Sequence, residues 1–267
     1  MKTILIIRNV IIFCLITCFN CSKDSVSDDI SFTPDLYTYV PDDKFEQLLI
    51  DLGYDDKLND YVLTDNIKNV TSLTLGSGGL FVTLGAGIKD FTGIEGFENL
   101  ESFSLNGLGI GSLDLSKNIA LKYLRCSFNN LTVLDLSNNT SLEWLNCRYN
   151  DLIVLDLSNN LNLTYLECDT NNLTVLDISK CTALNKIICW NNRISILDIS
   201  NSIILEHLNC ATNQITSLDV SNNISLSYLN SHSNLFTCIQ VNQEQFENIP
   251  YNWQPPGQDV IYSINCN

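Results

Sequence analysis

The amino-acid sequence predicts a solenoid, one elongated domain in which short coils of chain stack along an axis. A block of 21 residues recurs from about Leu100 to Val241, and a fixed period with fixed residue types indicates one repeated structural unit. Within each block, two leucine clusters show the alternation of apolar residues that is typical of extended chain. An asparagine and an aspartate also return once per block, at Asn129, Asn150, Asn171, Asn192, Asn213 and Asn234, and at Asp114, Asp135, Asp156, Asp177, Asp198 and Asp219.

The first leucine cluster of each block predicts a short strand that pairs with its equivalents in a parallel sheet. In the clearest copy it contains Leu142, Leu145 and Cys147, and the second cluster follows at residues 152–157. One block alone cannot bury these side chains, so stability must come from neighbouring coils that share a core.

The recurring polar residues predict turn contacts. The asparagines follow the strand where the chain must turn inward, and an inward amide can satisfy backbone groups of its own turn and of the next coil. The aspartates stand in Leu-Asp-Leu-Ser and should cap turns through their side chains. A calcium-binding aspartate column is the alternative, and it is disfavoured because the glycine-rich calcium-loop pattern is absent.

Five cysteines occupy a leucine position of the block, at Cys126, Cys147, Cys168, Cys189 and Cys210. Free cysteine behaves as a small buried hydrophobe, so these residues predict a ladder of reduced thiols. Parallel side chains on neighbouring strands do not converge as a disulfide requires, and a column cannot form a tetrahedral zinc site.

The frame L-x-x-L-x-C-x-x-N-x-L-x-x-L-D-L-S-x-N resembles leucine-rich repeats of the internalin type, most closely the 21-residue cysteine-ladder variety. It is also similar to the repeats of surface lipoproteins of Bacteroidetes-type bacteria. The resemblance covers a little over half of the chain and implies a curved, right-handed solenoid of about eight coils, with the parallel sheet on its concave face. It implies little about the ligand, because one scaffold serves many partners.

The N-terminal residues predict export. In residues 1–20, Lys2 and Arg8 precede an apolar run from Val10 to Phe19 that is too short to span a membrane and has the form of a signal peptide. Cys21 resembles the lipidated cysteine of such lipoproteins; the alternatives are Cys18 or cleavage without lipid. Residues 21–36 then form a flexible tether, which gives a lipid-anchored protein of the outer membrane or cell surface.

Residues 37–69 predict a helical N-terminal cap that Asp42 begins and Gly53 ends. Its apolar face should consist of Phe45, Leu48, Leu49 and Leu52. The polar residues after it indicate a solvated turn rather than a metal site: Asp55, Asp56, Asn59 and Asp60. The repeats then span residues 70–241 with a glycine-rich insertion at 76–93, which lacks the Gly-Lys-Ser/Thr of a phosphate loop.

Residues 242–267 predict a C-terminal cap held by a disulfide between Cys238 and Cys266. An exported chain meets an oxidising compartment, and these cysteines lie outside the ladder. Cys181 replaces the asparagine found at Asn139 and Asn160, has no matched partner and is expected to be free. A reduced Cys238–Cys266 pair is the alternative.

Binding residues are expected on the outward side of the strands, where side chains alternate away from the core. Exposed aromatic and arginine side chains are frequent anchors of binding surfaces, and cross-strand packing is the alternative role. The candidates lie in three columns, the third of which follows each strand: Tyr123, Arg125, Trp144, Arg148, Tyr165, Trp190, His207 and Tyr228. His207 and His232 should face solvent as isolated residues rather than form a metal pair.

Catalysis is not expected, because the sequence contains no nucleophile elbow, zinc-protease motif or cysteine–histidine dyad; no cofactor or metal is expected either. The formal charge of −16 disfavours binding to nucleic acid. The sequence therefore predicts a monomeric, non-catalytic cell-surface protein that binds a protein or polysaccharide. The alternatives are a structural envelope protein and a glycan-holding accessory of a hydrolase system.

Overall fold

The structure is a computed structural model that describes residues 36–76, 84–253 and 259–266. These residues belong to one compact unit, Thr33–Asn267. The expected signal peptide, lipidation at Cys21, all but the last residue of the tether and part of the insertion lie outside the described residues. Within the described residues, no helix is both long and apolar enough to cross a membrane.

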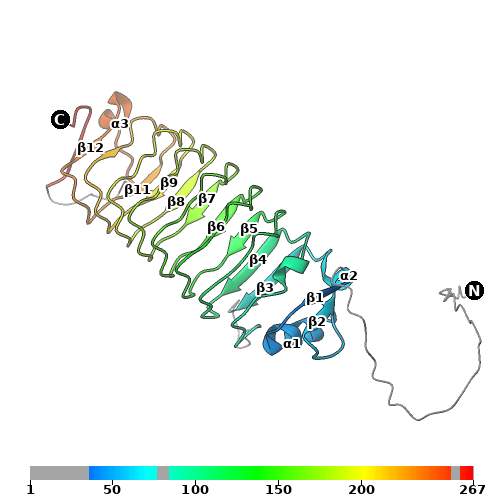
Figure 1. The fold of residues 1–267 in the computed structure, drawn as a ribbon. Coiled ribbons are helices and arrows are strands. Elements are labelled where there is room, and N and C mark those ends of the chain that lie inside the picture. Colours follow the sequence, from blue (N-terminus) through cyan, green and yellow to red (C-terminus); the bar gives the residue numbers. More distant parts are fainter. Residues whose placement is uncertain (1–35, 77–83, 254–258, 267) are drawn as a thin grey trace, which may run out of the picture. The chain divides into compact units, whose positions relative to one another are not determined.

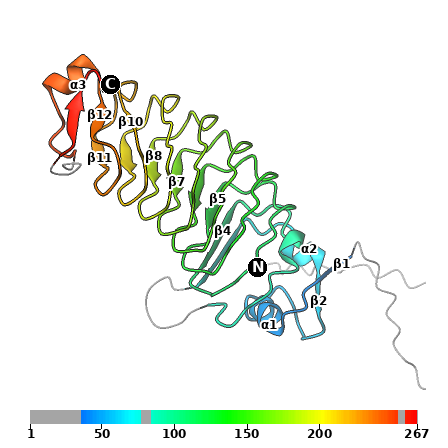
Figure 2. The ribbon, with the colours of Figure 1, turned by 60° about the vertical axis from the view of Figure 1, so that its left-hand side comes forward.

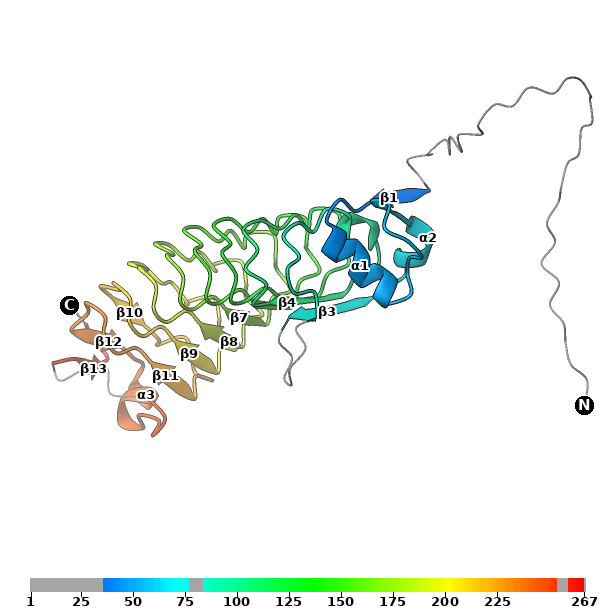
Figure 3. The same cartoon turned by 90° about the horizontal axis from the view of Figure 1, so that it is seen from below.

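The unit is a solenoid whose main element is a parallel sheet of eight strands (Figure 1). The strands follow one another in chain order from the N-terminal end, with the order unbroken except that β10 lies outside this sheet. They are β3 (Ser72–Gly76), β4 (Ser102–Asn106), β5 (Tyr123–Arg125), β6 (Trp144–Asn146), β7 (Tyr165–Glu167), β8 (Lys186–Ile188), β9 (His207–Asn209) and β11 (Tyr228–Asn230). Figure 3 shows them along one side of the stack, and the predicted fold class is confirmed.

Leucine side chains fill the interior because each short strand turns its central residue inward. Leu124, Leu145 and Leu166 are fully buried, and they pair in register across neighbouring strands. The predicted cysteine ladder is confirmed: its five cysteines and Cys181 are buried and free. Burial raises the pKa of the Cys126 and Cys210 thiols to about 12, which keeps them protonated and unreactive.

The asparagine ladder, defined as Asn129, Asn150, Asn171, Asn192, Asn213 and Asn234, points inward as predicted. The amide of Asn150 donates to the carbonyls of Cys126 and Cys147, both at 3.0 Å, and its oxygen accepts from the Leu131 N–H at 3.0 Å. The bonds between coils therefore go to the preceding coil and not to the next one, which corrects the expected direction. In the preceding coil, the carbonyl of Cys126 and the N–H of Leu131 both face this amide.

The N-terminal cap combines helices with a two-stranded antiparallel sheet of β1 (Tyr37–Tyr39) and β2 (Tyr61–Leu63). Helices α1 (Asp43–Asp51) and α2 (Thr64–Ile67) follow these strands, and they lie at the opposite end of the stack from α3 (Figure 2). Asp42 caps α1, and Gly53 has a left-handed φ of 79°, as predicted. Leu52 is 40% exposed, which is contrary to the prediction, because it lies at the C-cap, where the chain leaves the helix.

A 3-10 helix, η1 (Ile94–Gly96), brings the chain from the insertion into the regular coils. At the other end, β12 (Cys238–Gln240) pairs with β10 (Leu218–Asp219) and β13 (Ile261–Ser263) in a parallel sheet, and α3 (Gln243–Glu247) lies between β12 and β13 in the chain. The predicted Cys238–Cys266 disulfide is present. Trp253 packs over the last coil and donates from Nε1 to the Leu226 carbonyl at 3.2 Å. This tail closes the core.

Candidate functional site

The candidate site is the outward side of the eight-stranded sheet, called here the sheet face. One column of it holds residues in exact sequence register across six strands: Tyr123, Trp144, Tyr165, Lys186, His207 and Tyr228. Because parallel strands lie about 4.8 Å apart, flat side chains in one column come within stacking distance. The 21-residue period therefore places the aromatic side chains of this column next to one another on neighbouring strands.

Four rings of this column stack in two pairs. The centroids of Trp144 and Tyr165 are 4.9 Å apart with planes 17° from parallel, and the Lys186 ammonium lies 5.0 Å from the centre of the Tyr165 ring. His207 and Tyr228 stack at 4.1 Å. His207 is therefore half-buried and not the solvent-facing residue that was predicted. Its pKa is lowered, first by burial and then by the charge of Lys186.

A hollow of about 430 Å³ lies beside this stack, over the first strands of the sheet. The small side chains of Thr74, Ser102 and Ser104 line it from β3 and β4, and the larger ones of Tyr123, Arg125 and Trp144 line it from β5 and β6. Arg125 is exposed, and it takes part in neither of the two ion pairs found among the described residues. The hollow thus offers hydroxyl groups, aromatic edges and an unpaired guanidinium.

The middle of the sheet face holds an acidic pair, Glu167 and Asp169, which are only 9% and 1% exposed. Glu167 accepts hydrogen bonds from the Asn146 amide and the Tyr165 hydroxyl. The Oδ1 atom of Asp169 has no partner, and neither does the Nε atom of the nearby Arg148. Burial, and to a lesser extent the charge of Glu167, raises the pKa of Asp169 to about 6, although Arg148 opposes the shift.

The third predicted column is less exposed than expected. Arg148 and Trp190 are half-buried and His232 is exposed, but three members are buried: Ser127, Asp169 and Ala211. The physical reason is that this column lies past the end of each strand. The next residue adopts a left-handed φ between 51° and 58° in these six coils, so the chain bends away from the strand direction and strict alternation of side chains no longer holds.

An aromatic pair that the sequence reasoning missed lies at this bend. The rings of Phe128 and Tyr149 stack at 4.4 Å, and the Arg148 guanidinium carbon is 5.2 Å from the Phe128 centroid. Both aromatic side chains are exposed, at 47% and 38%. Left-handed backbone is unfavourable for bulky residues. The signal in the sequence that could have indicated this pair was the aromatic residue directly before the repeated asparagine in two neighbouring blocks.

A second hollow, of about 910 Å³, lies on the flank that carries the aspartate column. Its aspartates are turn caps, as predicted: Asp114 and Asp135 accept the backbone N–H of Ser116 and Ser137, each at 2.9 Å. These hydrogen bonds lower the pKa of both carboxyl groups. The carboxylates of these repeated aspartates therefore stabilise turns of the fold.

Comparison with known proteins identifies the fold. No family model matches the chain, and no curated protein matches it. A leucine-rich-repeat protein of Leptospira interrogans is 18% identical, with a TM-score of 0.54 over 66% of this chain and 52% of that one. Internalin C2 of Listeria monocytogenes is 19% identical, with a TM-score of 0.50 over 76% of this chain and 95% of that one.

The functional domain of InlJ from Listeria monocytogenes, which includes a cysteine ladder, is 28% identical, with a TM-score of 0.44 over 77% of this chain and 56% of that one. The matched part thus spans about half of the InlJ and Leptospira chains. The similarity to the Leptospira protein and to internalin C2 shows that the chain has the leucine-rich-repeat fold, and it shows the fold alone.

Proposed function

We propose that this chain is a non-catalytic binding protein of the cell surface, anchored through a lipid on Cys21, that holds a protein ligand on its sheet face. The observation that carries the proposal is the row of aromatic side chains from Tyr123 to Tyr228, which stand on the outside of a sheet whose core is already filled. Aromatic and arginine side chains of this kind anchor protein interfaces.

The arrangement of the rings favours a protein ligand over a polysaccharide. A sugar ring stacks on a free aromatic face, whereas Trp144 covers one face of Tyr165 and Lys186 lies over that ring as well. Ring edges and the positive charges of Arg125 and Lys186 remain accessible at the surface, whereas the acidic pair is buried. A polypeptide carries apolar side chains, backbone carbonyls and carboxylates that complement such a mixture of rings and positive charges.

The proposal is tested by capture on the immobilised full chain. Protein, glycan and envelope fractions are passed over wild type, the W144A/Y165A variant and the matched control Y251A, which removes an aromatic side chain that is 94% exposed outside the sheet face. We expect wild type and Y251A to retain a protein that binds W144A/Y165A about tenfold or more weakly, as loss of interface anchors predicts, while W144A/Y165A stays folded despite losing the hydrogen bond from Tyr165 to Glu167.

Two outcomes contradict the proposal. If W144A/Y165A melts at a lower temperature but retains the same material, the stack serves packing, and a structural envelope role is favoured. If a polysaccharide is retained in place of a protein, the glycan-holding alternative is correct. Mass spectrometry of the mature chain recovered from its envelope fraction reports on the anchor, and an unmodified N-terminus that begins at another residue excludes lipid on Cys21.

A further inference from the structure

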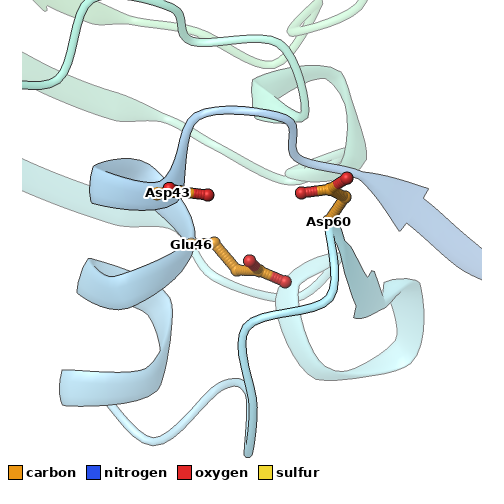
Figure 4. Close-up of side chains that lie close together, drawn as sticks. All are labelled: Asp43, Glu46 and Asp60. Atoms are coloured by element: carbon orange, nitrogen blue, oxygen red, sulfur yellow. The ribbon is translucent and has the colours of Figure 1, made fainter.

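Three carboxylates converge in the N-terminal cap, outside the sheet face. One oxygen from each of Asp43, Glu46 and Asp60 lies within 4.8 Å of the others, and Figure 4 shows the three side chains directed towards one another. The topology explains the convergence. The pairing of Tyr39 with Tyr61 in β1 and β2 brings Asp60 close to the start of α1, where Asp43 and Glu46 lie one turn apart.

Glu46 is the buried member of the group, with no exposed surface. Its Oε1 atom accepts the backbone N–H groups of Asn59 at 2.8 Å and Tyr61 at 3.1 Å, so this oxygen holds the loop against the helix. Its Oε2 atom is buried and has no hydrogen-bond partner. A buried carboxylate oxygen without a partner is costly, and here it belongs to a side chain that points at two further carboxylates.

No cation in the described part of the chain balances these charges. The ion pairs found there are Lys68 with Asp65 and Lys122 with Glu101. The start of α1 contributes only about half a positive charge, and Asp42 already shares that region by accepting four backbone N–H groups. A formal charge of −3 is therefore gathered around one point, next to a buried oxygen that lacks a partner.

We propose that Asp43, Glu46 and Asp60 form a calcium site. Two oxygens on opposite sides of Ca²⁺, each about 2.3–2.6 Å from it, are about 4.6–5.2 Å apart, which accommodates a group spread over no more than 4.8 Å. Mg²⁺ requires ligands at about 2.0–2.1 Å in strict octahedral geometry and usually takes one or two carboxylates. The group contains neither histidine nor cysteine, the ligands that favour zinc.

The site differs from the solvated turn that the sequence indicated at residues 55–60. That turn supplies only Asp60, and helix α1 supplies the other two ligands, so no compact sequence motif marks the site. A bound ion would join the loop that ends at Asp60 to α1 and would thereby fasten the cap that covers the first coil. With three carboxylates and water completing the coordination, the expected Kd is about 10⁻⁴–10⁻³ M, as in extracellular calcium modules.

The test uses the full chain with Tb³⁺ as a luminescent substitute for Ca²⁺. Tyr61 adjoins Asp60, and its ring lies 5.3 Å from that of Tyr39, so tyrosine excitation should sensitise bound Tb³⁺. We expect a luminescence signal that Ca²⁺ displaces and a matching calcium isotherm by calorimetry. The D43N/D60N variant should bind Ca²⁺ at least about tenfold more weakly, because it loses two of three charged ligands.

The matched control is D51N/D56N, which removes the same formal charge from exposed carboxylates of the same cap and should bind like wild type. E46Q keeps an oxygen that can accept from Asn59 and Tyr61 and should weaken binding in a folded cap, so it decides the question if D43N/D60N does not fold. The proposal is overturned if Ca²⁺ does not displace the signal, if D51N/D56N loses binding equally, or if folded D43N/D60N and E46Q bind like wild type.

Discussion

The asparagine ladder and the acidic pair are both buried polar groups of the same coils, but they are satisfied to different extents. In the ladder, Asn171 repeats the contacts of Asn150 almost to the tenth of an ångström, with bonds of 3.1, 3.1 and 3.0 Å to the Cys147 and Cys168 carbonyls and the Leu152 N–H. In the acidic pair, Asp169 Oδ1 has no partner, and the other coils place uncharged or basic residues at its position.

The difference distinguishes polar groups that the fold requires, as in the asparagine ladder, from polar groups that it only accommodates, as in the acidic pair. A polar group that makes the same hydrogen bonds in every coil, buried in four coils and half-buried at Asn192 and Asn234, stabilises the stacking, because each coil completes the hydrogen bonds of the one before it. A polar group that is buried once, without all of its bonds, weakens the stack. Exceptions of this kind in an otherwise consistent structure are expected at functional sites, and this one lies in the middle of the sheet face.

The largest effect is expected from breaking the ladder. Asn150→Ala leaves the buried Leu131 N–H without its partner, and it removes one of the two amides that bond the Cys126 and Cys147 carbonyls, which keep those of Asn129 and Asn171. At about 1–3 kcal/mol for the unsatisfied N–H and about 0.5–1.5 kcal/mol for each of the two lost bonds, the free energy of unfolding should fall by about 2–5 kcal/mol in chemical denaturation. Asn159→Ala is the control in the same coil, since this exposed side chain makes one bond, to the Ser137 carbonyl. A loss for Asn150→Ala no larger than that of the control would contradict the argument.

The acidic pair predicts an effect of opposite sign. The Asp169 carboxyl has a pKa of about 6 in the folded protein against 3.8 for an unperturbed aspartate, so between these values the folded state holds more protons than the unfolded state. Stability contributed by this group is thus present at low pH and lost as pH rises towards 6. Asp169→Asn should raise the free energy of unfolding at pH 7.5 by about 1–2 kcal/mol, a value reduced for solvent screening on the sheet face.

Denaturation of wild type and Asp169→Asn at pH 4 and pH 7.5 measures this difference. The two proteins should differ by less at pH 4, where the wild-type carboxyl is largely protonated in the folded state. Asp198→Asn is the matched control, because Asp198 accepts the Ser200 N–H and its pKa is lowered; this variant should lose stability at neutral pH. A destabilised Asp169→Asn at pH 7.5 would show that Arg148 compensates the buried charge.

The sequence predicted the regular features of the molecule because they depend on one residue type at one period. The inward asparagines, the aspartate caps and the cysteine ladder are of this kind, and the Cys238–Cys266 disulfide followed once the ladder cysteines were set aside. Burial of Asp169 depends instead on the bend after each strand, and the convergence of Asp43 with Asp60 depends on strand pairing in the cap. Neither feature has a period, so the repeat pattern could not reveal it.

A second asparagine column is intermediate between the asparagine ladder, whose hydrogen bonds are complete, and the acidic pair, whose hydrogen bonds are incomplete. It gives the smallest predicted effect on stability. Asn139 and Asn160 each donate two hydrogen bonds of 2.9–3.1 Å to carbonyls of the preceding coil, but their Oδ1 atoms have no partner. In the next coil Cys181 takes this place, and its sulfur lies 3.6 and 3.7 Å from the equivalent carbonyls. This column tolerates replacement because the same carbonyls also accept turn N–H groups, such as that of Asn160 at Leu157.

Cys181→Asn should therefore stabilise the protein, but only slightly. Two amide bonds replace two weak thiol contacts, at about 0.5–1.5 kcal/mol each, and the cost of one more buried oxygen without a partner offsets most of this gain. We expect an increase of about 0.5–1 kcal/mol in the free energy of unfolding. The reverse change in the neighbouring coil, Asn160→Cys, should lower it by a similar amount, and chemical denaturation of both variants measures the pair. If Cys181→Asn is destabilising while Asn160→Cys is neutral, the second column contributes through packing volume and not through its hydrogen bonds, and its likeness to the asparagine ladder is one of sequence alone.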